Sequence, residues 1–316
     1  MTGLIVAVDG GQSGIRVRTS SSPEVWETQG ASRLEGDPLA TIARLVVEVV
    51  QAHHIGDVAT LSLGLSTVPG MDKVARDFAQ SLGIQVHAKR VIVTDDALTH
   101  HAAQFQGAPG VALAIGTGTA CTVVGSSGPL RSVSGYGFLL GDDGGAFWVG
   151  RQALRYVLDD RHSGKPDGSL SQAAATTFGP LEQLPALMHS RDRPVNDMAH
   201  FARDVFSALG EDPVALRVLQ EACDALVGSS ERALEVVKDD AGIDSIVWTS
   251  KLFTGYPQAQ ESLHLSLQAR WPNSKVILGR GAPIDGALWL GDCDDFGPYG
   301  DRLIIENLEE WTHHVS

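Results

Sequence analysis

The sequence predicts an α/β protein of two domains built around a duplicated mixed-sheet core. The chain has 316 residues, of which 43% are hydrophobic and 20% charged, so it is long enough for two sizeable hydrophobic cores. Short apolar strands alternate with helical patterns. A unit of strand, glycine turn and strand opens the chain around Asp9–Ser13 and recurs around Gly116–Thr119. This recurrence is what indicates the duplication.

The first domain is expected to span residues 1–107. Its opening strand, Leu4–Val8, is a continuous apolar run, and Ile15–Thr19 beyond the glycine turn alternates with period two, so the two strands form a hairpin. Asp37 before Pro38 is a typical helix start. The other elements expected here are a strand at 24–28, a helix at 38–50, a strand at 60–65, a helix at 71–82, a strand at 91–94 and a helix ending near 104.

The second domain is expected to span residues 108–316. It opens with a second hairpin, whose strands are Val111–Ile115 and Ala120–Val124. Residues 143–238 follow a mostly helical pattern, broken by a glycine- and proline-containing loop at 163–168, and form a helical insertion. Strands return at 246–248 and 275–278, each followed by a helix. The amphipathic tail from Asp301 is left unassigned.

Composition narrows the classes of partner. The formal net charge of −14 repels phosphate backbones and anionic lipid, so we expect neither nucleic acid nor a membrane surface as a partner. Cys121, Cys223 and Cys293 are odd in number and far apart, which excludes a disulfide framework and indicates a reducing compartment. No export signal or membrane-spanning run is evident. These features predict a cytoplasmic protein.

The two glycine turns are candidate phosphate cradles. Each follows a buried strand, and glycines let backbone N–H groups converge on an anion. Asp9 ends the first strand and is placed to hold Mg²⁺ through water. The turns join strand to strand, so they are neither a Walker A loop nor a dinucleotide fingerprint, and a plain hairpin turn is the alternative for each alone. The candidate phosphate-binding residues are Gly10, Gly11, Gln12, Ser13, Gly116, Thr117, Gly118 and Thr119.

A third glycine cluster, Ser134–Trp148, has the character of a binding floor. Its glycines allow close backbone approach, and Asp142 and Asp143 can accept hydrogen bonds from ligand hydroxyls near the start of the following helix. Such a floor suits a polyol. The alternative is a glycine-rich turn in which an aspartate caps that helix.

Together these motifs resemble the N-acetylglucosamine kinase branch of the actin-like (ASKHA) sugar kinase superfamily, a group that also contains the BadF/BadG/BcrA/BcrD-type ATPases. The resemblance covers Val6–Leu290, and it implies a two-domain, ribonuclease H-like, actin-like ATPase fold with the active site between the domains. The segments that carry it are Val8–Ser13, Val93–Ala97, Ala114–Thr119 and Gly135–Gly150.

The resemblance implies a catalytic role for one of two adjacent aspartates. By similarity, Asp96 is the general base that takes the proton of the acceptor hydroxyl, and Asp95 caps the helix. The alternative is that both merely cap the helix. His100, one turn further on, is expected on a solvated helix face, and the histidine doublets are not expected to bind metal.

The resemblance also assigns ligand contacts. The sugar is expected to meet Asp96, Thr117, Gly135, Tyr136 and Asp142, with the Tyr136 ring offering a flat face in place of the family's usual tryptophan. Asp37 is a further candidate, which would favour a cationic 2-amino group, although a helix N-cap is the alternative there. Nucleotide contacts beyond the two turns are expected at Thr249, Ser250, Gly281, Ala282 and Gly286.

The activity implied by the resemblance is an ATP-dependent amino-sugar kinase. Such an enzyme would use ATP with Mg²⁺ to phosphorylate a hydroxyl, the 6-hydroxyl in this family, of N-acetylglucosamine or glucosamine. Two alternatives stay open: a BadF-type ATPase without a sugar substrate, and a sugar-responsive binding protein without catalysis. The resemblance also allows for a homodimer.

Overall fold

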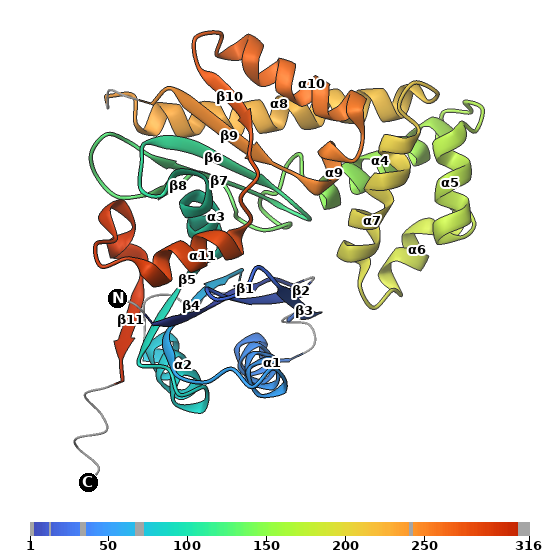
Figure 1. Ribbon diagram of the computed structural model, residues 1–316. Helices are drawn as coiled ribbons and strands as arrows, with labels where there is room; N and C mark the ends of the chain where they lie inside the picture. The colour runs from blue at the N-terminus through green and yellow to red at the C-terminus, as the bar shows by residue number, and fades with distance from the viewer. Residues whose placement is uncertain (1–2, 13, 32–35, 67–72, 240–242, 309–316) are drawn as a thin grey trace.

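Figure 1 shows the computed structural model, which describes residues 3–12, 14–31, 36–66, 73–239 and 243–308. Two sheets dominate it, the first in the lower half of the view and the second in the upper half. Both mix parallel and antiparallel strands, as predicted. Within the described ranges we find no helix with the length and apolar character needed to cross a bilayer.

The first sheet has six strands in the order β11-β5-β4-β1-β2-β3. The central strand β1 pairs antiparallel with β2 and parallel with β4. Val6, Ala7 and Val8 are fully buried in it, which explains the continuous apolar run. The strands are β1 Leu4–Gly10, β2 Gly14–Thr19, β3 Val25–Gln29, β4 Val58–Leu65, β5 Arg90–Asp95 and β11 Ile304–Asn307.

The second sheet repeats this topology. Its five strands lie in the order β10-β9-β6-β7-β8, with β6 antiparallel to β7 and parallel to β9. If β11 is left aside, the order matches that of the first sheet strand for strand, so the predicted duplication is confirmed. The strands are β6 Gly110–Ile115, β7 Thr119–Val124, β8 Arg131–Ser132, β9 Ser245–Thr249 and β10 Lys275–Leu278.

The helices follow the predicted pattern. Helices α1 and α2 cover the lower side of the first sheet, and α8 and α10 lie along the second, while α4–α7, the first part of the helical pattern predicted over 143–238, lie to one side (Figure 1). The loop between α4 and α5 is at residues 163–168, as expected. The helices are α1 Pro38–Ala52, α2 Lys73–Gln85, α3 Asp96–Phe105, α4 Ala146–His162, α5 Ser169–Phe178, α6 Leu184–His189, α7 Pro194–Ser207, α8 Pro213–Val236, α9 Lys251–Thr254, α10 Pro257–Arg270 and α11 Pro283–Asp292, with short 3₁₀ turns η2 Leu181–Gln183 and η3 Gly297–Arg302.

Two helices change sides between the sheets. Helix α3 follows β5 of the first sheet but packs on β6 and β7 of the second, whereas α11 follows β10 of the second sheet but packs on β1 and β4 of the first. The two helices also pack against each other. A Cβ on Gly286 of α11 would lie 1.8 Å from the Thr99 carbonyl oxygen of α3, so only glycine allows this approach.

The tail, left unassigned from the sequence, belongs to the first sheet. Its turn η3 leads into β11, which pairs antiparallel with β5 at the sheet edge. Tyr299 of η3 is completely buried. The predicted helix at 71–82 is present as α2 from Lys73, while its first two positions lie outside the described residues.

Candidate active site

Asp95 and Asp96 stand where β5 ends and α3 begins. The Asp95 carboxylate accepts a hydrogen bond from the Leu98 N–H at 2.8 Å, so the prediction that Asp95 is the N-cap of α3 is confirmed. Asp96 is the first helical residue, and α3 does not depend on it for its cap. The arrangement leaves the two carboxylates with different surroundings.

The Asp96 carboxyl is held in an unfavourable environment for charge. Part of its surface remains accessible, yet it lies deep enough among protein atoms that burial raises its pKa from 3.8 to about 7. The negative charges of Asp9 and Asp95 add to this rise, and backbone N–H groups at the start of α3 oppose it. A carboxyl with a pKa near neutrality can take up and release a proton at physiological pH.

Asp9 lies at the carboxyl end of β1, with β4 between it and the end of β5, and its charge reaches Asp96. It is 7% exposed, and burial raises its pKa. Arg16 opposes that rise through a 3.1 Å ion pair with Asp9, and Lys251 opposes it through its charge. Arg16 also contacts Glu27 at 2.6 Å, so one guanidinium is shared between two carboxylates.

The pair of Asp9 and Asp96 fits a cation. Burial raises the pKa of both carboxyls, the charge of Asp9 adds to the rise at Asp96, and a divalent ion would relieve that cost. Among the described residues there is no group of three or more histidine, cysteine, aspartate or glutamate side chains arranged to hold a metal. A Mg²⁺ ion here would therefore take most of its ligands from water and from a bound ligand, as this ion commonly does.

The first glycine turn joins β1 to β2 as predicted. The Gly11 N–H donates to the Gly14 carbonyl at 3.0 Å, so this amide closes the turn. Gly10 is buried, and a Cβ there would lie 2.6 Å from a Leu65 methyl group. Gln12 is exposed at the tip of the turn, and Ser13 lies outside the described residues.

The second glycine turn joins β6 to β7 and rests on the start of α4. The Gly116 and Thr117 carbonyls accept hydrogen bonds from the Ala146 and Phe147 N–H groups at 3.0 and 2.9 Å. Gly116 and Thr117 are exposed, so this part of the turn is open to a ligand. A Cβ on Gly118 would lie 2.2 Å from an Asp142 oxygen, so a side chain there would displace the Asp142 carboxylate.

Asp142 connects this turn to the glycine cluster at 134–148. Its Oδ1 accepts a hydrogen bond from the Thr119 N–H at 3.2 Å, and burial raises its pKa. Its φ of +62° lies in the left-handed region, which aspartate adopts more readily than most residues other than glycine. The alternative in which an aspartate caps α4 is wrong, because the N-cap is Gly145 and makes no side-chain cap bond.

Gly135 and Tyr136 lie on the exposed loop before Asp142. Gly135 has a φ of +99°, which favours glycine, and Tyr136 is 63% exposed with its hydroxyl donating to the Val133 carbonyl at 3.3 Å. The ring of Tyr136 is thus free to meet a ligand. Its contact with a sugar stays a prediction.

Thr249 and Ser250 end β9, and their hydroxyls are used inside the protein. Ser250 caps α9 by accepting from the Phe253 N–H at 3.2 Å. The Thr249 Oγ1 lies 2.7 Å from Nε2 of His100, which is 3% exposed and whose pKa burial lowers to about 4. The expectation of a solvated face for His100 is therefore wrong: α3 lies between the two sheets, and this face of it meets β9.

Gly281, Ala282 and Gly286 hold α11 in place. The Gly281 carbonyl accepts from the Gln104 side chain of α3 at 2.7 Å, and the Ala282 N–H donates to Asp285 at 2.8 Å in the cap of α11. Gly286 is the contact point with α3 described above. Their role beside a nucleotide stays a prediction.

Asp37 acts as the N-cap of α1. Its Oδ1 accepts from the Leu39 N–H at 2.9 Å, so the alternative given for this residue is confirmed. It also lies at a groove between α1 and α2, on the lower side of the first sheet. A sugar contact for Asp37 stays a prediction.

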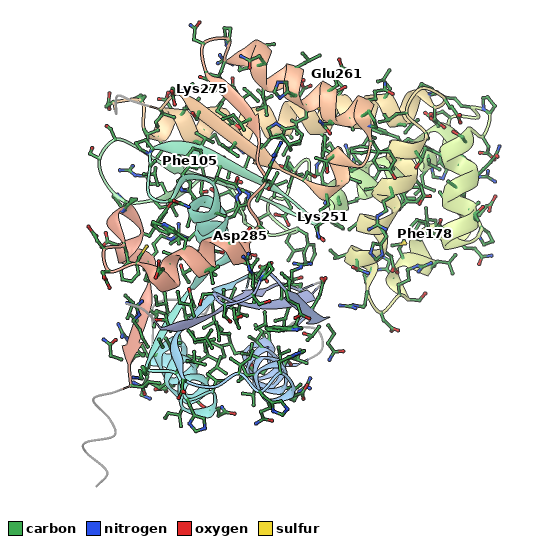
Figure 2. The ribbon with its side chains drawn as sticks, in the orientation of Figure 1. Phe105, Phe178, Lys251, Glu261, Lys275 and Asp285 are labelled. Carbon is green, nitrogen blue, oxygen red and sulfur yellow. The ribbon has the colours of Figure 1, made fainter. Side chains whose placement is uncertain are left out.

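Two cations near Asp9 were missed by sequence reasoning. Arg16 stands at a polar position of the alternating strand β2. Lys251 opens α9 directly after Thr249 and Ser250, and Figure 2 shows it on the side of α9 that faces the first sheet. The signal that could have found Lys251 is a lysine at the end of a parallel strand, where ligands bind in open α/β sheets.

Comparison with known proteins gives relatives of nearly the same length. An N-acetylmuramic acid/N-acetylglucosamine kinase of Clostridium acetobutylicum is 20% identical over 312 residues, covering 92% of this chain and 99% of that protein. Two solved structures of provisionally named N-acetylglucosamine kinases are similar to this one. The structure from Chromobacterium violaceum has a TM-score of 0.69 at 22% identity, and the match covers 91% of this chain and 98% of that chain. The structure from Porphyromonas gingivalis has a TM-score of 0.68 at 18% identity, and the match covers 91% of this chain and 97% of that chain.

A more distant structure shares the same fold. A ROK family glucokinase from Streptomyces griseus, solved with glucose and AMPPNP, has a TM-score of 0.58 at 12% identity, with 92% of this chain and 98% of that chain covered. The predicted actin-like sugar kinase fold is thereby confirmed. In a comparison of the sequence with models of protein families, one family matches residues 8–268, which is most of the chain. With its paired glycine turns and the aspartates between them, the chain belongs to the BadF/BadG/BcrA/BcrD ATPase family.

Proposed function

We propose that this protein is an ATP-dependent sugar kinase that phosphorylates an amino sugar, N-acetylglucosamine or glucosamine, at the 6-hydroxyl. One observation carries the proposal: Asp96, with a pKa of about 7, is the first residue of α3, directly after β5 and within reach of the charge of Asp9, where a general base for an alcohol is needed. Family membership supports ATP as the donor. The names of the relatives in Clostridium, Chromobacterium and Porphyromonas support an amino sugar as the acceptor.

The proposed reaction is an in-line phosphoryl transfer. The Asp96 carboxylate takes the proton of the sugar hydroxyl, the sugar oxygen forms a bond to the γ-phosphorus of ATP, and the bond from that phosphorus to the β,γ-bridging oxygen breaks to release ADP. The two glycine turns hold the phosphates. When bound, Mg²⁺ would neutralise charge on the phosphates, with Asp9 as its protein contact through water.

The sugar is proposed to lie against the loop that carries Gly135, Tyr136 and Asp142, near Thr117. The exposed ring of Tyr136 supplies an apolar face, and Asp142 supplies acceptor oxygens. Asp37 is proposed to favour a 2-amino over an acetamido group. Asp37→Asn should then change the ratio of kcat/KM for glucosamine to that for N-acetylglucosamine, and an unchanged ratio would contradict this role.

The function is tested by coupled ADP release across hexoses, hexosamines, N-acetylated sugars and anhydro-muramic acid. We expect ADP release to depend on an amino sugar and the product to carry phosphate at O6. ATP hydrolysis that no sugar accelerates would favour an ATPase without a sugar substrate. Sugar binding by calorimetry without any turnover would favour a binding protein.

Lys251 is proposed to contact the phosphates of ATP. Its charge already reaches Asp9, and it opens the helix after β9. We expect Lys251→Met to raise the KM for ATP about tenfold or more, the scale of one hydrogen bond to a charged group. The control is Lys275→Met, which removes an exposed lysine paired with Asp244 at the far end of the second sheet (Figure 2). Equal KM values for both variants would contradict the role.

A cytoplasmic location and a homodimer are also proposed. Cys121 and Cys223 are buried free thiols, which suits a reducing compartment. The strongly acidic charge argues against a nucleic-acid partner. Light scattering of the purified protein would test the dimer.

A further inference from the structure

The segment Gly297–Asn307 packs beside β5 and reaches Asp95, next to the proposed base Asp96. The family match ends at residue 268, so this segment is outside it. Its strand β11 pairs with β5, the strand that delivers Asp95 and Asp96, with Ile304 opposite Val93. The turn η3 before β11 therefore reaches the carboxyl end of β5.

One residue of this segment, Arg302, forms several bonds to the end of β5 and one to the second sheet. Its guanidinium forms a 2.6 Å ion pair with Asp95, and its carbonyl accepts a hydrogen bond from the Thr94 hydroxyl at 3.0 Å. The same guanidinium donates to the Ser132 hydroxyl of β8 at 2.8 Å. Arg302 thus joins the end of β5 to the edge of the second sheet.

The ion pair completes the hydrogen bonding of Asp95. Oδ1 of Asp95 accepts the Leu98 N–H at the start of α3, and Oδ2 meets Arg302. Both oxygens are therefore committed to the protein, and the side chain is fixed in one orientation. Asp96, the next residue, is left as the aspartate of the pair that can face a ligand.

We propose that Arg302 is a positioning residue for phosphoryl transfer, which locks Asp95 as the cap of α3 and so fixes the place of Asp96. This inference rests on the proposed function, in which Asp96 is the base. It gives a role to the segment Gly297–Asn307, which lies outside the family match. Arg302 acts through Asp95 and has no contact of its own with the substrates.

The kinetic test compares Arg302→Gln with Arg302→Lys in the full chain. We expect Arg302→Gln to lower kcat for the sugar about ten- to a hundredfold with a near-constant KM for ATP, since small misplacement of a catalytic group has effects of this size. Arg302→Lys keeps the charge and should recover most of the loss. In the Asp95→Asn background, Arg302→Gln should have little further effect. Additive losses, or no loss in kcat, would overturn the proposal.

A matched control separates positioning from a loosened tail. Arg76 of α2 pairs with Glu306 of β11 at 2.8 Å, so Arg76→Gln loosens the same strand without touching Asp95. We expect Arg76→Gln to leave kcat close to that of the wild type. An equal loss of kcat in Arg76→Gln and Arg302→Gln would show that only tail attachment matters and would overturn the proposal.

A second readout needs no activity. In hydrogen exchange of the free protein, Arg302→Gln should speed exchange at the start of α3, residues 96–99, by about fivefold, the scale of a lost cap, whereas Arg76→Gln should not. Unchanged exchange there would overturn the proposal even if the wild type is a kinase. Faster exchange in a protein without sugar-dependent turnover would leave Arg302 as the lock of Asp95 and would refute the proposed function instead.

Discussion

Asp96→Asn is expected to lower kcat for the sugar about a hundredfold or more, with a smaller effect on the KM for ATP. The reason is that an amide cannot take the proton of the acceptor hydroxyl, and general-base catalysis has effects of this size. The wild-type rate should rise with pH up to about 7, where Asp96 becomes ionised, and then level off. Steady-state assays from pH 5 to 9 measure both.

The same substitution should stabilise the folded protein above pH 7. The pKa of Asp96 is raised from 3.8 to about 7 on folding, so its contribution to stability is complete below pH 3.8 and is lost as the pH rises through 7. Asparagine carries no charge and does not undergo this loss. In urea unfolding, the free energy of unfolding of the variant relative to that of the wild type should therefore be higher at pH 8 than at pH 5.

Asp95→Asn is the control for the stability measurement. It removes the 2.6 Å ion pair with Arg302 from a residue whose carboxylate caps α3, so it should destabilise the protein at pH 8. A kcat of Asp96→Asn near that of the wild type would reassign the base. A stability difference that does not vary with pH would contradict the buried charge.

Gly286→Val is expected to destabilise the fold strongly. A Cβ at this position would lie 1.8 Å from the Thr99 carbonyl oxygen and 2.8 Å from the Ala103 nitrogen, which are backbone atoms of α3 that cannot turn aside. The two helices must move apart, and we expect a loss of about 3 kcal/mol or more in the free energy of unfolding. Because α3 carries Asp96, kcat should fall as well.

Gly56→Ala provides the comparison for Gly286→Val. A Cβ at Gly56 meets nothing within 4 Å, so this change should leave unfolding by urea nearly unaffected. Gly286→Ala should lie between the two variants. A Gly286→Val protein that unfolds at the wild-type urea concentration would show that α3 and α11 are not locked together in solution.

Local patterns in the sequence were enough to predict most strands of the two sheets and part of the site. The predicted strands and the two glycine turns depend on residues close together in the chain, because turn chemistry is set by immediate neighbours. The assignment of Asp95 as the cap and Asp96 as the base came from the resemblance to the kinase family, and the structure confirms the cap at Asp95.

The contacts that complete the site could not be predicted in this way. Arg302 meets Asp95 across 207 residues, and His100 meets Thr249 across 149. The error at His100 has a general cause: helical periodicity shows which face is apolar, but a polar face can meet another part of the chain instead of water. Only the packed structure distinguishes the two.

The exchange of helices between the sheets affects how the chain must fold. The upper side of the first sheet is covered mainly by α11, residues 283–292, which is synthesised long after the five strands β1–β5. Until then α3 covers only part of this surface, through its contacts with β4 and β5, so the first sheet cannot be completed early during translation and a fragment ending before α11 should aggregate. For the same reason neither sheet should melt alone, and the described part of the chain should unfold in one cooperative step.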